Sequence, residues 1–143
     1  MKKAAEIFSE FLEGKSLKLT PERATVLEEI SMLRRHFDIE GFYVSLKNKG
    51  LKVSRASIYR TIPLLVESGL LEEIKTMDRH TYYEYTFGRA HHDHMICLSC
   101  GKVIEFYSPK LEKIQDEVCK KEGFSGARHL LEIQGYCNSC GTP

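Results

Sequence analysis

Hydrophobic residues in the first half of the chain recur three and four residues apart, which is the spacing of one face of a helix. The pattern predicts a first helix around Phe8 that ends at Gly14. It predicts a second helix with Thr20 as its N-cap and Pro21 at its first position. The apolar stripes are Ile7, Phe8, Phe11 and Leu12 in the first helix and Val26, Leu27, Ile30 and Leu33 in the second.

Two further helices follow at the same spacing. The third is expected from Ile39 to Lys49, with an apolar face and Gly50 after its end. The fourth begins after Ser54 and ends at Gly69, and Pro63 inside its pattern favours a kink. The inward residues are Phe42, Tyr43 and Leu46 in the third helix and Ile58, Ile62, Leu65 and Val66 in the fourth.

A β-hairpin is predicted next. Residues 70–75 and 81–86 form its strands, the second of them rich in Tyr and Thr, and a polar turn at 76–80 joins them. The second to fourth helices followed by a hairpin have the order of a winged helix-turn-helix, in which the fourth helix enters the DNA major groove and the hairpin is the wing. A small helical bundle with a solvated basic face fits the pattern equally well.

The fourth helix carries side chains suited to DNA. We expect its exposed face to offer Arg55, Ser57, Tyr59, Arg60 and Thr61. Arginine can donate two hydrogen bonds to guanine or bind phosphate, and a tyrosine ring can pack on a thymine methyl group. The overall charge of +1 neither reveals nor excludes such a local basic face.

The second half differs in composition, because all five cysteines and four of the six histidines lie between His91 and Cys140. A helix is predicted from Pro109 to Glu122 within this half. The break at 88–90 predicts a hinge between a DNA-binding domain at 1–87 and a metal-binding αβ domain at 88–143. The predicted fold class is therefore α+β.

The 143 residues, 42% of them hydrophobic and 29% charged, are typical of a folded soluble protein. The first residues contain no unbroken apolar run, so we expect neither a signal peptide nor a membrane span, and a cytoplasmic location. In the cytoplasm, five cysteines more often bind metal or react than form disulfides.

The motif CxxCG occurs twice, with Cys97 and Cys100 in the first copy and Cys137 and Cys140 in the second. The two-residue gap lets both thiolates of a motif bind one ion, and two motifs complete the tetrahedral S₄ site that structural zinc prefers. An iron centre of the rubredoxin kind fits the same spacing. Metal here would join the start of the second half to the chain's end, so chelation should loosen the whole half.

Four adjacent potential ligands, His91 to His94 with Asp93 among them, precede the first CxxCG motif. In a strand, His92 and His94 would lie on one face and His91 and Asp93 on the other, so one segment could serve two sites. Imidazole with carboxylate suits Fe(II), Mn(II) or Zn(II). Further donors are His36, Glu84, Glu105, Glu112 and His129, and a single histidine such as His36 or His129 is more often structural than ligating.

The fifth cysteine, Cys119, lies in the last predicted helix, close to the stripe of Leu111, Ile114 and Val118. We expect it to be a small buried hydrophobic side chain.

The sequence resembles the ferric uptake regulator family of bacterial metal-dependent repressors. The resemblance covers nearly the whole chain and rests on SLKLTPERATVL, HFDIEGFY, SRASIYRTIPLLVESGLL, YYEYT, HHDHMICLSCGKVIEF and GYCNSC. It implies a homodimer whose N-terminal winged helices bind AT-rich palindromic operators in double-stranded DNA and whose C-terminal αβ halves form the dimer. It implies neither a membrane nor a small-molecule substrate as partner.

The resemblance also implies roles for individual residues. Structural zinc would be held by Cys97, Cys100, Cys137 and Cys140. A regulatory metal would be held by His36, Glu84, His92, His94 and Glu105, and a second metal by His91, Asp93, Glu112 and His129. The residues matching the family's DNA contacts are Lys18 for the minor groove and Tyr59 and Arg60 on the recognition helix, which Arg55 and Ser57 accompany.

The metal implied is Fe(II), controlling iron-uptake genes. Peroxide-sensing relatives carry aspartate at the position of Glu105, and zinc-sensing relatives carry a cysteine ahead of the histidine cluster, where this chain has tyrosines. Sensing of manganese, zinc or peroxide stays open as an alternative. The rival functions are a metalloenzyme that activates water and an electron-transfer module with iron on the four cysteines. Neither accounts for the winged-helix half, so no enzymatic activity is expected.

Overall fold

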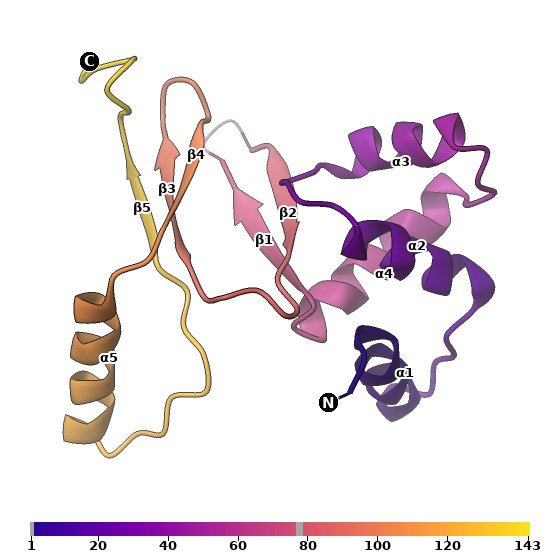
Figure 1. Cartoon of the computed structure of the whole chain (residues 1–143), viewed down its shortest axis with the longest axis horizontal. Helices are drawn as coiled ribbons and strands as arrows, with labels where there is room; N and C mark the ends of the chain where they lie inside the picture. Colours follow the sequence, from indigo (N-terminus) through magenta and orange to yellow (C-terminus); the bar gives the residue numbers. More distant parts are fainter. Residues whose placement is uncertain (1, 77–78) are drawn as a thin grey trace. The chain divides into compact units, whose positions relative to one another are not determined.

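The computed structural model of the chain describes residues 2–76 and 79–143, which leaves residues 77–78 of the expected polar turn outside the described part. The chain forms two compact units, Met1–Arg89 and Ala90–Pro143 (Figure 1). Among the described residues, no helix has the length and apolar character needed to cross a membrane.

The first unit contains α1 (Ala4–Gly14), α2 (Pro21–Ser31), α3 (Ile39–Asn48), α4 (Arg55–Glu67), β1 (Leu71–Lys75) and β2 (Thr81–Tyr85). Short polar side chains fix where three of these helices begin. Thr20, Asp38 and Ser54 each accept a hydrogen bond from the backbone N–H three residues later, at 2.9–3.3 Å. These bonds satisfy N–H groups that have no partner within the helix.

The core of the first unit lies between the helices and the hairpin. Its fully buried side chains include Phe8, Leu12, Ile30, Leu46, Ile58, Ile62 and Leu65. Burial of each contributes about 1.5–3 kcal/mol. The helix α4 continues through Pro63, and β1 pairs antiparallel with β2. The predicted winged helix-turn-helix is therefore confirmed, and the plain helical bundle is excluded.

One predicted surface residue of α4 is in the core. Thr61 is only 1% exposed, and its hydroxyl donates to the carbonyl of Ser57 at 2.6 Å. The prediction that Thr61 lies on the exposed face is wrong, because position 61 falls three residues after Ile58 and four before Leu65, on the same side of the helix.

The second unit is a three-stranded sheet with one helix. Its elements are β3 (Asp93–Cys97), β4 (Val103–Phe106), α5 (Pro109–Lys121) and β5 (Glu132–Gly135), and the strand order is β4-β3-β5. β3 is antiparallel to β4 and parallel to β5. Two parallel strands need a crossover connection, which α5 supplies (Figure 1). The predicted α+β class is confirmed.

The apolar stripe of α5 is exposed in the single chain. Ile114 and Val118 are 46% and 55% exposed, and no residue of α5 is fully buried. Cys119 is half-buried, so the expectation of a buried side chain is wrong. The physical reason is size, because a unit this small has few elements with which to cover a helix.

Candidate metal sites and DNA-binding surface

The four cysteines of the two CxxCG motifs come together in the second unit. Cys97 ends β3, Cys100 lies in the turn after it, and the parallel strand β5 brings Cys137 and Cys140 alongside. Their sulfur atoms all lie within 4.8 Å of one another, and those of Cys100 and Cys137 are 3.8 Å apart. Zn–S bonds of about 2.3 Å give a tetrahedron with edges of about 3.8 Å. The cluster therefore fits one tetrahedral ion.

Backbone N–H groups stabilise the thiolate form of Cys97. The N–H of Cys137 donates to its sulfur at 3.4 Å, and backbone hydrogen bonds from Cys100 and Cys137 lower the pKa of Cys97 to about 6. The thiolate, which is the form that binds metal, therefore predominates at neutral pH. Gly101 and Gly141 close the two turns at φ of +73° and +65°, a conformation that favours glycine.

A second cluster in this unit contains two imidazoles and two carboxylates. Nε2 of His91 and of His129 each lie 3.2–3.5 Å from Oδ1 of Asp93 and Oε1 of Glu112. Ligand bonds of about 2.0–2.1 Å give tetrahedron edges of about 3.3–3.4 Å. Within the described residues, His129 Nε2 and Glu112 Oε1 are buried without a hydrogen-bond partner. Buried polar atoms of this kind need a partner, and a cation satisfies both.

In the first unit, a short backbone bridge places His36 beside Glu84. Phe37 and Tyr83 exchange two backbone hydrogen bonds, at 3.0 and 2.8 Å, in an isolated antiparallel bridge. The residue before one partner then faces the residue after the other. His36 Nε2 lies 3.5 Å from Glu84 Oε2, and Glu84 is only 1% exposed. A carboxylate so deeply buried requires compensating charge or hydrogen bonds.

The other oxygen of Glu84 is bound by an arginine that sequence reasoning did not single out as a functional residue. Nη1 of Arg89 donates to Oε1 of Glu84 at 2.9 Å, and its Nη2 donates to the carbonyl of Leu33 at 3.0 Å. Arg89 is the last residue of the first unit. Its guanidinium thereby links the wing strand to the segment after α2 that carries His36.

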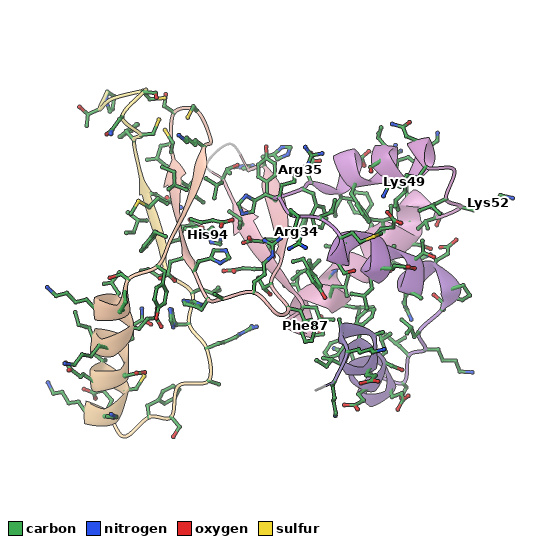
Figure 2. The ribbon with its side chains drawn as sticks, in the orientation of Figure 1. Arg34, Arg35, Lys49, Lys52, Phe87 and His94 are labelled. Carbon is green, nitrogen blue, oxygen red and sulfur yellow. The ribbon has the colours of Figure 1, made fainter. Side chains whose placement is uncertain are left out.

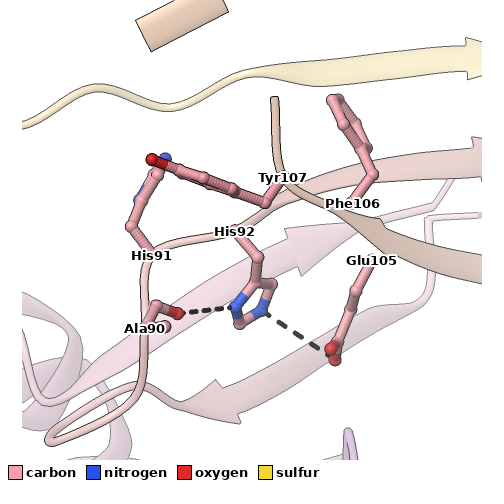
Figure 3. A pocket seen from close by; sticks show the side chains of 6 residues that line it. All are labelled: Ala90, His91, His92, Glu105, Phe106 and Tyr107. Carbon is pink, nitrogen blue, oxygen red and sulfur yellow. Dashed lines mark hydrogen bonds and ion pairs between the residues drawn. The ribbon is translucent and has the colours of Figure 1, made fainter. Parts of the chain in front are cut away.

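Three other predicted ligands gather within the second unit. His94 of β3 is the register partner of Glu105 of β4. His92 Nε2 lies 3.9 Å from Glu105 Oε1, and the His92 and His94 rings are 5.0 Å apart. His92 Nδ1 is 3.1 Å from the carbonyl of Ala90. Figure 3 shows the adjoining pocket of about 640 Å³, lined by Ala90, His91, His92, Glu105, Phe106 and Tyr107.

The histidine segment divides its side chains between two groups. His91 lies with Asp93, and His92 lies beside His94. The strand begins only at Asp93, so His91 and His92 precede it instead of standing within it as expected.

The first unit presents most of the predicted DNA-contacting side chains at its surface. The Tyr59 ring is 48% exposed, and its hydroxyl donates to Oε1 of Glu40 at 2.9 Å, which raises the pKa of Tyr59. The Arg55 guanidinium lies 4.7 Å over the Tyr43 ring and 3.3 Å from Oε2 of Glu40. Glu40, in the first turn of α3, was not among the predicted residues, although it holds two of them.

The other predicted DNA contacts lie around the start of α2 and along α4. Lys18 and Arg60 are exposed, and Ser57 is half-buried. Arg60 and Ser57 line a hollow of about 390 Å³ together with Arg23. Arg23 also donates to the backbone carbonyl of Lys18 at 2.6 Å. Two arginines and a helix N-terminus suit a phosphate group, although the Glu22 carboxylate also lines this hollow.

Comparison with known proteins gives consistent matches. Residues 14–134 match the sequence model of the ferric uptake regulator family. The chain is 35% identical over 137 residues to the ferric uptake regulation protein of Campylobacter jejuni, covering 94% of this chain and 87% of that protein. It is 30% identical over 131 residues to the peroxide operon regulator of Bacillus subtilis, covering 92% of this chain and 89% of that protein.

Solved structures show the same fold. The ferric uptake regulator of Pseudomonas aeruginosa with manganese has a TM-score of 0.80 at 28% identity, covering 96% of this chain and 99% of that one. The regulator of Helicobacter pylori, described as having three functional metal binding sites, has a TM-score of 0.74 at 28% identity, covering 97% and 94%.

Proposed function

The chain belongs to the ferric uptake regulator family, and we propose that it is an Fe(II)-responsive repressor of iron-uptake genes. Members of this family are metal-responsive regulators of transcription and not enzymes. The observation that carries the proposal is the distribution of imidazole and carboxylate ligands. His36 and Glu84 lie 3.5 Å apart in the first unit, and His94 and Glu105 are register partners in the second.

The regulatory ion would be bound by both sets, His36 and Glu84 from the first unit and His92, His94 and Glu105 from the second. Mixed nitrogen and oxygen donors suit Fe(II), with Mn(II) and Zn(II) as alternatives. An ion bound by residues on both sides of the hinge would restrict the hinge angles. Operator affinity would rise because a symmetric dimer reaches two half-sites only at a fixed spacing. Linkage then requires that operator DNA tighten metal binding equally.

The four cysteines are proposed to hold structural zinc. A closed S₄ site carries no open position for chemistry and adds its binding free energy to folding. The cluster of His91, Asp93, Glu112 and His129 would bind a second divalent ion, and its 3.2–3.5 Å spacings support this assignment.

Operator recognition is assigned to α4 and the start of α2, in a homodimer. Tyr59 and Arg60 would contact bases and backbone in the major groove, with Arg55 and Ser57 beside them, and Lys18 would reach the minor groove of an AT-rich palindrome. The exposure of Tyr59, Arg60 and Lys18 supports this assignment.

The test is operator binding measured without oxygen as Fe(II), Mn(II) or Zn(II) is added. We expect Fe(II) to tighten binding by tenfold or more, within the usual allosteric range of about 5–150-fold. In Glu105→Ala, the response should disappear while one zinc per chain remains. The control Glu122→Ala removes an equal charge at the end of α5 and should respond normally. An operator affinity indifferent to all three metals would refute the proposal.

Peroxide sensing is a second candidate, because the peroxide operon regulator of B. subtilis is among the relatives. The two functions are separated by exposing the Fe(II)-loaded protein to peroxide and measuring histidine oxidation by mass spectrometry. An iron sensor should retain unmodified histidines and its operator affinity, whereas a peroxide sensor should gain oxygen on a ligand histidine and release DNA.

A further inference from the structure

We propose that Arg89 is a built-in counter-cation of Glu84 that lowers the affinity of the regulatory site for divalent metal. This inference rests on the proposed function, since it takes Glu84 as a metal ligand. Arg89 itself is a positioning residue, because it acts on the ion through Glu84. It follows the wing strand β2 and ends the first unit.

The first step is the charge that Glu84 needs. With 1% exposure, its ionised carboxylate has lost almost all contact with water and is stable only if opposite charge or hydrogen bonds replace that water. The Arg89 guanidinium, itself only 24% exposed, supplies a full positive charge at 2.9 Å from Oε1. The carboxylate is therefore neutralised by the chain's own side chain.

The second step is the division of the two carboxylate oxygens. Oε1 accepts from Arg89, whereas Oε2 faces Nε2 of His36 at 3.5 Å. An ion shared with His36 would therefore use Oε2, and Glu84 would bind through that oxygen alone. Arg89 would remain on Oε1.

The third step is the effect on affinity. A guanidinium that stays bound to a metal ligand places like charge near the ion and draws electron density away from the carboxylate. Both effects oppose a divalent cation. Without Arg89, the metal would supply the positive charge that Glu84 lacks. Loss of Arg89 would then destabilise the metal-free protein more than the metal-bound protein, and metal would bind more tightly by the difference between these two free energies.

Arg89 also anchors the chain through the carbonyl of Leu33, three residues before His36. Loss of this anchor alone would disorder a ligand-bearing segment and weaken metal binding. Lysine separates the two roles, because its ammonium retains the charge but lacks the planar fork that reaches both acceptors.

The experiment compares Arg89→Gln and Arg89→Lys with the unchanged protein, all in a His129→Ala background that removes the second site. Each protein carries one zinc per chain, and Mn(II) binding is titrated by electron paramagnetic resonance. Arg35→Gln is the control, because Arg35 is an exposed arginine next to His36 (Figure 2). It removes the same charge beside a ligand, but from a position in water.

For Arg89→Gln we expect the Kd for Mn(II) to fall by about tenfold or more, since the charge lies in a partly buried site. The Kd of Arg89→Lys should stay within about threefold of that of the parent protein, because the charge in the site is retained. The Kd of Arg35→Gln should do the same, because the charge it removes is exposed to water and already screened. Arg89→Gln should also lower the Tm of the metal-free protein and enlarge the rise in Tm that Mn(II) produces.

Two results would overturn the inference. An unchanged Kd with equal loss of Tm in the metal-free and Mn(II)-bound protein would make Arg89 a structural anchor only, and a raised Kd would make it a support for the site. A Glu84→Gln arm distinguishes this failure from failure of the proposed function. If Glu84→Gln leaves Mn(II) affinity unchanged, Glu84 is not a ligand, whereas weaker binding there without tightening in Arg89→Gln refutes only the role of Arg89.

Discussion

Single distances separate two kinds of contact between charged side chains in this protein. Arg89 and Glu84 meet at 2.9 Å, the length of a charge-assisted hydrogen bond. His91 and His129 lie 3.2–3.5 Å from Asp93 and Glu112, longer than the bond of Arg89 to Glu84 and close to the edges of about 3.3–3.4 Å expected for ligands of one tetrahedral ion. The spacing of this cluster therefore supports the proposal that its four residues are ligands.

This distinction predicts the effect of His129→Ala. The variant should bind one divalent ion fewer per chain, because it removes one of four donors and leaves Asp93 and Glu112 with a single imidazole. Metal content after dialysis is measured by mass spectrometry, and zinc should remain at one per chain. His80→Ala, which alters an exposed histidine of the wing, is the control. Equal metal content in the two variants would contradict the assignment of the second site.

Helices and strands were predictable because their signals are local. Thr20 and Ser54 cap their helices, and the apolar spacing of α4 places Ile58 and Leu65 inside. The same spacing already implied that Thr61 is buried, but its polar side chain suggested otherwise. The local pattern is therefore sufficient to predict helices, strands and their buried faces, provided that the hydrophobic periodicity is given more weight than the polarity of a single residue.

Contacts between elements were not predictable in the same way. The motifs identified most ligand types, and the family resemblance grouped them. Glu40 was missed because its partners Arg55 and Tyr59 lie in another helix. Arg89 was missed although Glu84 is only five residues away, because a spacing of five in a strand and turn does not itself predict a contact. Glu84 faces His36 only because Phe37 pairs with Tyr83, a bridge between segments far apart in sequence. No spacing in the sequence encodes that pairing.

The contact between α3 and α4 predicts a gain of DNA affinity in Glu40→Gln. Glu40 holds Tyr59 and Arg55 and places negative charge on the face assigned to DNA. Removing that charge should weaken the contact with Arg55, lessen repulsion of phosphate, and raise operator affinity by about threefold at low salt, with a smaller gain at high salt. Fluorescence anisotropy at two salt concentrations measures this effect.

Glu28→Gln is the matched control, because Glu28 is an exposed glutamate of α2 in the same unit. Its operator affinity should change less than that of Glu40→Gln. A loss of affinity in Glu40→Gln would mean that Glu40 orients Tyr59 for DNA instead of restraining it.

At the scale of the whole molecule, the two units differ in what stabilises them. The first has a core of fully buried side chains, whereas the helix of the second buries none. The second unit instead has the cysteine cluster, which joins the end of β3 to the segment after β5. We therefore expect metal bound to this cluster to be the main source of stability of the second unit.

Removal of zinc should accordingly unfold the second unit and spare the first. Cys137→Ser, or prolonged chelation, is expected to abolish hydrogen-exchange protection in β3, β4 and β5 while the amides of α2 and α4 remain protected. Cys119→Ser is the control, since Cys119 lies outside the cluster. Uniform loss of protection across both units would show instead that the first unit depends on the second for its stability.

The exposed apolar side chains of the second unit predict where two copies of the chain meet. β5 is an edge strand of the sheet, and its side chain Ile133 is 43% exposed. The apolar stripe of α5, Ile114 and Val118, is exposed to a similar extent. An uncovered edge strand with apolar side chains is a site for pairing with another chain.

Ile133→Glu should therefore raise the dimer dissociation constant by tenfold or more, because burying one unpaired charge costs about 2 kcal/mol or more. Sedimentation equilibrium measures this constant, and Val44→Glu, at a side chain 52% exposed in the first unit, should leave it unchanged. Operator affinity of Ile133→Glu should fall in proportion to the loss of dimer, since each monomer carries only one recognition helix. A stable Ile133→Glu dimer would move the interface away from β5.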